Sequence, residues 1–485
     1  MVSAAVLTLY GTDESSRRAT ISVIPGDVLL DIFDFYRKNH NYSFRPVWEW
    51  HVLVHVCRRW RQVIFGSPHR LNLQILCTNR TPVQRNLDIW PAFPIVLGYE
   101  FLGGDGPKGL GDVKAALEHP DRVCNVKLKA TGSQLATVVT VMQEPFPVLT
   151  HFEITSWDGM AVVLPAEFLG GSAPCLQEIY LYGVRFPALP SLLLSTNDLV
   201  ALTLRGVSQA GYISSEAMIV GLAALTRLET LTIGIQSVTP RLDHIRPPPE
   251  TRTVLPALTS FTFQGAYEHL EDLVAQIESP QLDQIRVTYL NYLVDVSAAQ
   301  LSEFVDRSMG PKFRRARVGY VGDCMSFSIS RYANHPYSDW NSARTIVSCE
   351  GISWEVPHVT QILGQFSATL ATIIHLELVQ LGEARELENT SDVEWLHLLN
   401  QFPATQTLLV SWELAGSVAL ALEHITGEMV AELLPSLDLI CLEDQRESSV
   451  NNFEFVAARR LSDRPVTVVN MRKEFEKRLE AYISK

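Results

Sequence analysis

Apolar residues recur along most of this chain in one pattern, L-x-x-L-x-L, in which leucine or a similar residue fills three of six positions. Alternation of this kind predicts a short β-strand with one buried face. Clear copies begin at Val123, Leu149, Leu176, Leu199, Leu228, Leu258 and Leu282, and less regular copies begin at Phe313, Ile373, Thr405 and Leu437. The 60 residues between Phe313 and Ile373 indicate that one copy near residue 343 is degenerate or carries an insertion.

The other copies begin 23 to 32 residues apart, a spacing with one short strand per unit that is typical of leucine-rich repeats. The segments 221–228 and 268–280 have helical spacing, so we expect a helix between successive strands. The fold class predicted is therefore α/β, a solenoid (horseshoe) of alternating strands and helices. Over 313–356 the pattern is irregular, which indicates β-structure packed on the array or, alternatively, an insertion that contacts a substrate.

Residues between the leucines of each strand are predicted to point to the concave face of the solenoid, a natural surface for binding another protein. The candidate substrate-binding residues are Glu153, Tyr180, Tyr182, Thr203, Arg205, Arg286 and Thr288, with Thr262 and Gln264 in equivalent positions.

A separate helical unit is predicted before the repeats. After Pro25-Gly26-Asp27, apolar residues follow at helical spacing: Val28, Leu29, Ile32, Phe33 and Tyr36. A second helix is expected from Val47 to Phe65, with a stripe of Trp50, Leu53, Val56, Cys57, Trp60 and Ile64. Two short helices cannot bury this many apolar residues against each other, so we expect an exposed surface that binds a partner.

The order of these residues resembles an F-box. Ile24-Pro25, Val28-Leu29, Ile32-Phe33, VCRRWR from Val56 to Arg61 and Ser67-Pro68 match the family's Leu-Pro start, its first helix and its Val-Cys-Arg-x-Trp helix. The resemblance covers roughly residues 21–70. It departs from the pattern in Ile24, where the family has leucine, and in a longer loop between the helices. This long-loop form, followed by the segment CTNRTPVQRNLDIWPAFPIVL (77–97), is similar to a group of fungal F-box proteins with leucine-rich repeats.

The resemblance implies a substrate-recognition subunit of a Skp-cullin-F-box ubiquitin ligase. It implies that the N-terminal helices bind a Skp-family adaptor, and through it a cullin, while the repeats bind an unknown protein substrate. The positions that carry over as adaptor-binding residues are Ile24, Pro25, Val28, Leu29, Ile32, Phe33, Val56 and Trp60. Arg58, Arg59 and Arg61 are expected at the solvent or adaptor-facing edge of the second helix. On this interpretation the chain is not an enzyme and needs no cofactor.

Composition and charge limit the classes of partner and the compartments that we expect for this chain. The 485 residues carry a net charge of -13, which repels phosphate backbones, so neither basic run, CRRWRQ nor FRRARV, is expected to bind nucleic acid. The seven cysteines are scattered without CxxC, which fits a reducing compartment. No apolar stretch is long enough to cross a bilayer and no secretory signal is apparent, so a cytoplasmic or nuclear protein is expected.

Two patterns suggest chemistry. His51 and His55 are one helical turn apart, but the glutamate that a zincin requires between them is absent, and we expect no metal site. Gly104, Gly106 and Gly109 form G-x-G-x-x-G, so a nucleotide-binding enzyme that uses the loop over 103–111 is one alternative function. A second alternative is a repeat scaffold that recruits no ligase.

The expected organisation is therefore a disordered N-terminus (1–20), an F-box-like helical domain (21–70) and a connecting segment with the glycine-rich loop (71–120). Leucine-rich repeats (121–442) and a C-terminal cap with a terminal helix (443–485) follow.

Overall fold

The computed structural model describes residues 24–38, 49–79, 83–101, 107–236, 251–290, 297–310, 313–321, 324–331, 345–349, 356–381, 391–423, 432–443, 459 and 464–470. Gly104 and Gly106, and all of the segment expected to form the terminal helix, lie outside these residues. The chain divides into two compact units, Met1–Gly98 and Tyr99–Lys485. Within the described residues, no helix is both long and apolar enough to cross a membrane.

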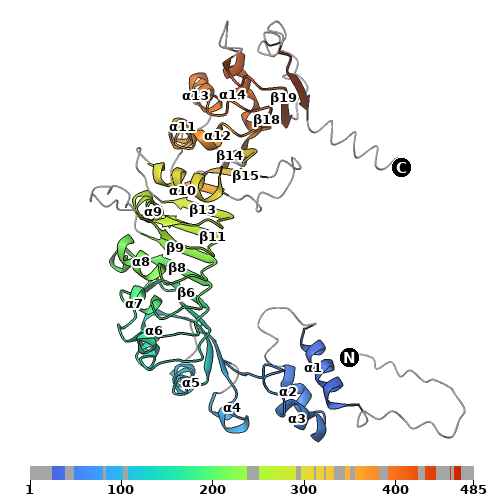
Figure 1. Ribbon diagram of the computed structural model, residues 1–485, viewed down its shortest axis with the longest axis vertical. Coiled ribbons are helices and arrows are strands. Elements are labelled where there is room, and N and C mark those ends of the chain that lie inside the picture. Colours follow the sequence, from blue (N-terminus) through green and yellow to red (C-terminus); the bar gives the residue numbers. More distant parts are fainter. Residues whose placement is uncertain are drawn as a thin grey trace, which may run out of the picture. The chain divides into compact units, whose positions relative to one another are not determined.

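The first unit packs short helices around an aromatic cluster. Its elements are α1 (Gly26–Lys38), α2 (Glu49–Val54), α3 (Arg58–Phe65), β1 (Ile75–Thr78), α4 (Val83–Ile89) and the first part of β2 (Ile95–Glu100). Figure 1 shows the four helices in blue. The Trp50 ring lies within 6.1 Å of the Phe65, Trp90 and Phe93 rings, and its indole N–H donates to the Gln74 carbonyl at 3.0 Å. The unit thus includes part of the segment expected to connect two domains.

The prediction of one continuous helix from Val47 to Phe65 is wrong. The chain breaks at His55-Val56, and Cys57 is extended (φ -158°, ψ 168°) and caps α3, its Sγ accepting from the Trp60 N–H at 3.5 Å. Because of the break, Trp50 and Trp60 pack against different neighbours. Trp50 packs on Phe93, whereas the Trp60 ring lies 4.8 Å from the Phe33 ring of α1.

The second unit is built on a large, mostly parallel sheet in the order β3-β4-β6-β8-β9-β11-β13-β16-β15-β14-β17-β18-β19-β20. These strands are β3 (Val123–Ala130), β4 (His151–Ser156), β6 (Glu178–Tyr182), β8 (Ala201–Val207), β9 (Thr230–Ile235), β11 (Ser260–Gly265), β13 (Gln284–Tyr289), β14 (Arg315–Val321), β15 (Cys324–Ser330), β16 (Thr345–Cys349), β17 (His375–Leu381), β18 (Thr407–Ser411), β19 (Leu439–Glu443) and β20 (Thr467–Asn470). Two short parallel pairs, β5 (Val162–Val163) with β7 (Val184–Arg185) and β10 (Thr253–Val254) with β12 (Ile277–Glu278), accompany it.

The register of the sheet confirms the predicted repeats. The second position of each clear copy is paired with the second position of the next, from Val126 through Phe152, Ile179, Leu202, Leu231 and Phe261 to Ile285. Leu376, Leu408 and Ile440 continue the alignment in the C-terminal strands. All of these side chains are buried. The pattern predicts the register because a slip of one residue would turn every leucine to the other face.

The irregular region forms strands within the sheet. β14 and β15 form an antiparallel pair, β15 pairs antiparallel with β16, and β16 lies parallel to β13. The copy that begins at Phe313 therefore does not adjoin the copy at Leu282, and Thr345–Cys349 occupies that place instead. Residues 345–349 form a single strand, and residues 350–355 lie outside the described residues.

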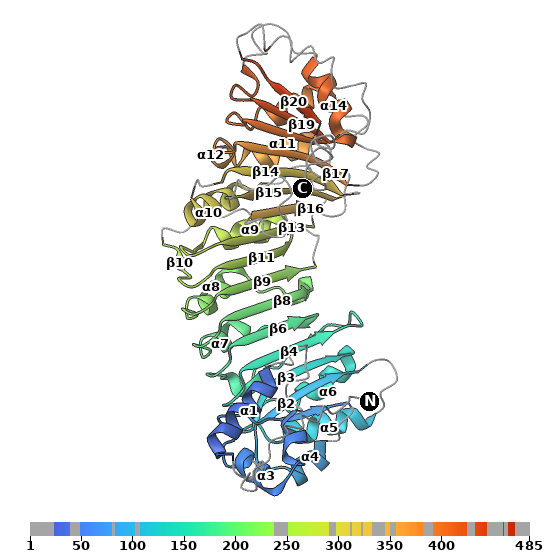
Figure 2. The same ribbon diagram turned by 90° about the vertical axis from the view of Figure 1, so that its right-hand side faces the viewer.

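Helices cover one side of the sheet, and Figure 2 views the other side. They are α5 (Pro107–Leu117), α6 (Gly132–Val139), α7 (Leu189–Leu193), α8 (Ser215–Leu222), α9 (Tyr267–Val274), α10 (Ala299–Met309), α11 (Val356–Gly364), α12 (Ser367–Leu370), α13 (Asp392–Leu399) and α14 (Trp412–Glu423). The helix expected over 221–228 lies earlier, as α8, and the one expected over 268–280 ends at Val274.

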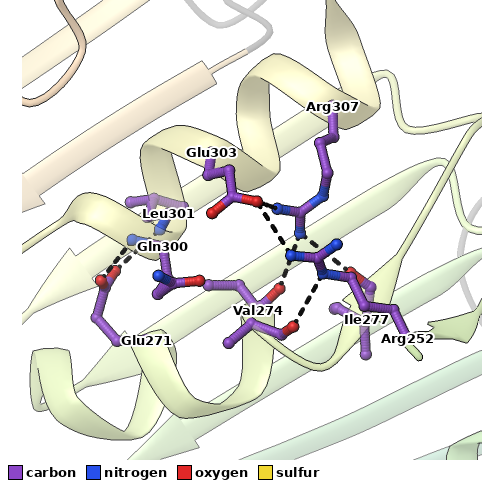
Figure 3. Close-up of polar contacts among 9 residues, drawn as sticks. Arg252, Glu271, Val274, Ile277, Gln300, Leu301, Glu303 and Arg307 are labelled. Carbon is purple, nitrogen blue, oxygen red and sulfur yellow. Dashed lines mark hydrogen bonds and ion pairs between the residues drawn. The ribbon is translucent and has the colours of Figure 1, made fainter. Parts of the chain in front are cut away.

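Polar contacts hold α9 and α10 together. Ala298 precedes α10 and offers no capping side chain, and the carboxylate of Glu271 accepts the backbone N–H groups of Gln300 and Leu301 instead, at 2.7 and 3.0 Å (Figure 3). In the same region, the Glu303 carboxylate forms ion pairs with Arg252, at 3.0 Å, and with Arg307, at 2.7 Å.

Candidate protein-interaction surfaces

Helix α1 carries apolar residues on its solvent side as well as on its packed side. Val28 is 42% exposed, Ile32 45% and Phe35 67%. Their spacing of four and three residues places them on one side of the helix. We call Val28, Ile32 and Phe35 the α1 face. An exposed apolar stripe on a helix that is already packed on its other side is typical of a binding surface.

The structure divides the residues predicted to bind the adaptor. Leu29 and Phe33 are fully buried, and Trp60 is half-buried against Phe33. These three hold the helices together. Pro25, Val28, Ile32 and Val56 are exposed, and Ile24 is half-buried. Sequence reasoning missed Phe35, although its position seven residues after Val28 was a signal that could have identified it.

The basic residues of α3 have structural roles. A guanidinium N–H of Arg59 donates to the Ile24 carbonyl, and the Arg61 Nε donates to the Val54 carbonyl at 3.0 Å. Arg58 and Arg61 are exposed, as expected for the solvent-facing edge, whereas Arg59 is half-buried. Arg59 and Arg61 thus join α3 to the start of α1 and the end of α2.

His51 and His55 form no metal site in the part of the chain that the structure describes. The His51 ring stacks on Trp90, with centroids 4.7 Å apart and an angle of 13° between the planes. Burial, with a smaller contribution from His55, lowers the pKa of His51 to about 4, so the ring is neutral at physiological pH. His51 is therefore a packing residue of the aromatic cluster.

A second surface is the side of the large sheet opposite the helices, which we call the sheet face. Strand pairing places most of the predicted substrate-binding residues in two rows. Glu153, Tyr180, Thr203 and Arg286 lie in one row, with Thr232 and Thr262 between the last two. Tyr182 and Arg205 are neighbours in the other row, and Thr288 lies farther along it. Tyr182, Arg205 and Arg286 are exposed. Their role in substrate binding stays a prediction.

Charges on the sheet face are paired at one end. Lys127 lies 2.7 Å from Glu153, Lys129 lies 3.5 Å from Glu100, and His151 Nε2 lies 3.5 Å from Glu178. Among the described contacts, Arg205 and Arg286 make no ion pair. Among the described residues, the sheet face therefore changes from paired lysines on β3 to arginines without an ion pair on β8 and β13.

The nucleotide alternative depends on the glycine loop. Of its three glycines, Gly109 alone is described, and it lies in the first turn of α5. A side-chain carbon at Gly109 would come within 2.9 Å of the Phe101 ring, so close packing is one reason for this glycine. The nucleotide-binding function stays a prediction.

Comparisons with known proteins do not assign the chain to a family. No family model and no curated protein matches it. Among solved structures, the leucine-rich repeat-containing protein LegL7 from Legionella pneumophila aligns with 76% of this chain and 98% of its own, at 10% sequence identity and a TM-score of 0.23. At that TM-score the alignment carries no argument, so the repeat architecture depends on the strand register described above.

Proposed function

We propose that this chain is the substrate-recognition subunit of a Skp-cullin-F-box ubiquitin ligase. The α1 face is the observation that carries the proposal. Val28 and Ile32 occupy positions of the F-box pattern and remain exposed, although Leu29 and Phe33 beside them are fully buried. An apolar stripe left exposed by its own unit indicates a partner, and the resemblance to an F-box suggests a Skp-family adaptor.

On this proposal the chain performs no chemistry. The first unit binds the adaptor, and the sheet face of the second unit binds the substrate. Holding both raises the effective concentration of a substrate lysine near the charged ubiquitin-conjugating enzyme.

A binding measurement with a purified Skp-family adaptor tests the proposal. The wild-type chain is expected to bind, and Ile32→Asp is expected to weaken binding at least tenfold because it places a charge in an apolar contact. Val220→Asp is the matched control, since Val220 is an exposed valine on a helix of the other unit. Absence of wild-type binding, or equal losses in the two variants, would contradict the proposal.

The second candidate is an interaction scaffold that recruits no ligase. It is favoured by the location of the sheet face in a separate compact unit, which could bind a protein without the α1 face. The same measurement separates the two candidates, because a scaffold of this kind does not bind the adaptor.

A further inference from the structure

Four neighbouring strands of the sheet face carry two arginines and no acid. The outward positions of β8, β9, β11 and β13 are Ala201, Thr203, Arg205, Thr230, Thr232, Gly234, Ser260, Thr262, Gln264, Gln284, Arg286 and Thr288. Arg205 and Arg286 are exposed. In a chain of net charge -13, this part of the sheet face is cationic.

The rest of the sheet face shows how this chain normally neutralises such residues. On β3 and β4, Lys127 is paired with Glu153, and Lys129 is paired with Glu100. Away from the sheet face, the exposed Arg227 is paired with Asp198 at 2.6 Å. Arg205 and Arg286 lack such a partner in the described residues, so their guanidinium groups are available to an external anion.

The surroundings of the two arginines favour a peptide over a small anion. Hydroxyl and amide side chains lie between them, including the half-buried Thr262 and the exposed Gln264, and can hydrogen-bond a peptide backbone. The exposed Tyr182 is the direct neighbour of Arg205 on β6. Tyrosine and arginine are the side chains that most often anchor protein interfaces.

We infer that the sheet face over β8–β13 binds an extended acidic segment of a partner protein. Arg205 and Arg286 are three strands and two residues apart in register, which corresponds to about 16 Å at ~4.8 Å per strand and ~3.3 Å per residue. An extended peptide covers that distance in about five residues. The segment therefore carries two carboxylates about five residues apart, one for each guanidinium. The inference rests on the proposed function only in that this partner would be the substrate.

Selection from a random peptide library displayed on phage, with the full-length chain immobilised, tests the inference. Peptides enriched by the wild type are expected to contain pairs of Asp or Glu about five residues apart. The most enriched peptide is then synthesised, together with a version in which Gln replaces the acids. Fluorescence anisotropy of both is measured against the wild type, Arg205→Ala, Arg286→Ala and the double variant. Arg227→Ala is the control, because it removes one exposed positive charge outside the sheet face.

Each arginine removed from the sheet face is expected to weaken binding of the acidic peptide about tenfold, as the loss of one charge-assisted hydrogen bond implies. The Gln peptide should bind all variants equally weakly, and Arg227→Ala should behave as the wild type. The inference is overturned if the enriched peptides lack Asp and Glu, or if the double variant binds the acidic peptide as tightly as the wild type does. Adaptor binding, measured on the same variants, should not change, so failure here is distinct from failure of the proposed function.

Discussion

The carboxylate of Glu271 on α9 accepts the backbone N–H of Gln300 at 2.7 Å and so caps the following helix, α10. Glu271 is buried, and burial raises the pKa of its carboxyl to about 7, although the hydrogen bonds from Gln300 and Leu301 oppose this rise. A contact between two repeats therefore contains a group that titrates near neutral pH.

Stability is expected to fall as the pH rises from about 4.5 to about 7. In this window the folded chain holds a proton on Glu271 that the unfolded chain has released, so rising pH favours unfolding. The difference between 4.5 and about 7 corresponds to roughly 3 kcal/mol. Chemical denaturation at pH 5 and pH 8 should show most of this loss in the wild type and a smaller loss in Glu271→Gln. Glu268→Gln, on the same helix, is the control, and the same pH dependence in both variants would disprove the assignment.

The two sides of α1 are expected to respond differently to substitution. Phe33→Ala should destabilise the first unit by about 3–5 kcal/mol, because the ring is fully buried against Trp60. Ile32→Ala should change stability by about 0.5 kcal/mol or less, since Ile32 is exposed. Thermal unfolding followed by tryptophan fluorescence measures both, and similar shifts in the two variants would mean that the α1 face is packed.

Gly132 and Gly111 are expected to differ although both are helical. At Gly132 a side-chain carbon would lie 2.5 Å from the Met160 carbonyl oxygen, and the Gly132 N–H is bonded to Asp158 at 3.0 Å. Gly132→Ala should therefore destabilise the second unit by about 1–3 kcal/mol. At Gly111 nothing lies within 4 Å, so Gly111→Ala should stabilise α5 by about 0.5–1 kcal/mol. Thermal melts with shifts of the same sign would contradict this geometry.

Glu377 and Glu303 each bridge two arginines, but at different depths. Glu377 is buried between Arg315 and Arg317, whereas the Glu303 side chain is 46% exposed between Arg252 and Arg307. Glu377→Gln should cost about 3–5 kcal/mol, because it leaves the buried Arg315 without its counter-charge. Glu303→Gln should cost about 1 kcal/mol or less, since exposed pairs are screened by water. Comparable losses in chemical denaturation would show that burial does not decide the difference.

The apolar pattern predicted the repeats because the alternation of apolar and polar residues within each strand determines which residues pair with the next strand. Phe261 and Leu231 are paired as their positions in the pattern require. The pattern could not show that Val347 pairs with Val287, because that choice depends on how the antiparallel strands β14 and β15 fold back. It also extended the second helix through Cys57, where capping of α3 and two separate aromatic contacts favour a break.

The sequence by itself determined which residues form the strands of the repeats, which of their side chains are buried, and that an apolar surplus exists near the N-terminus. Alternation and helical spacing are local properties, so they can be read without knowing the neighbours. Only the tertiary structure decided that Leu29 and Phe33 face inward while Val28, Ile32 and Phe35 face solvent, since both sides of α1 are apolar. It alone showed that Lys127 is paired with Glu153 while Arg205 makes no ion pair with a described residue, because ion pairs across a sheet depend on which strands become neighbours.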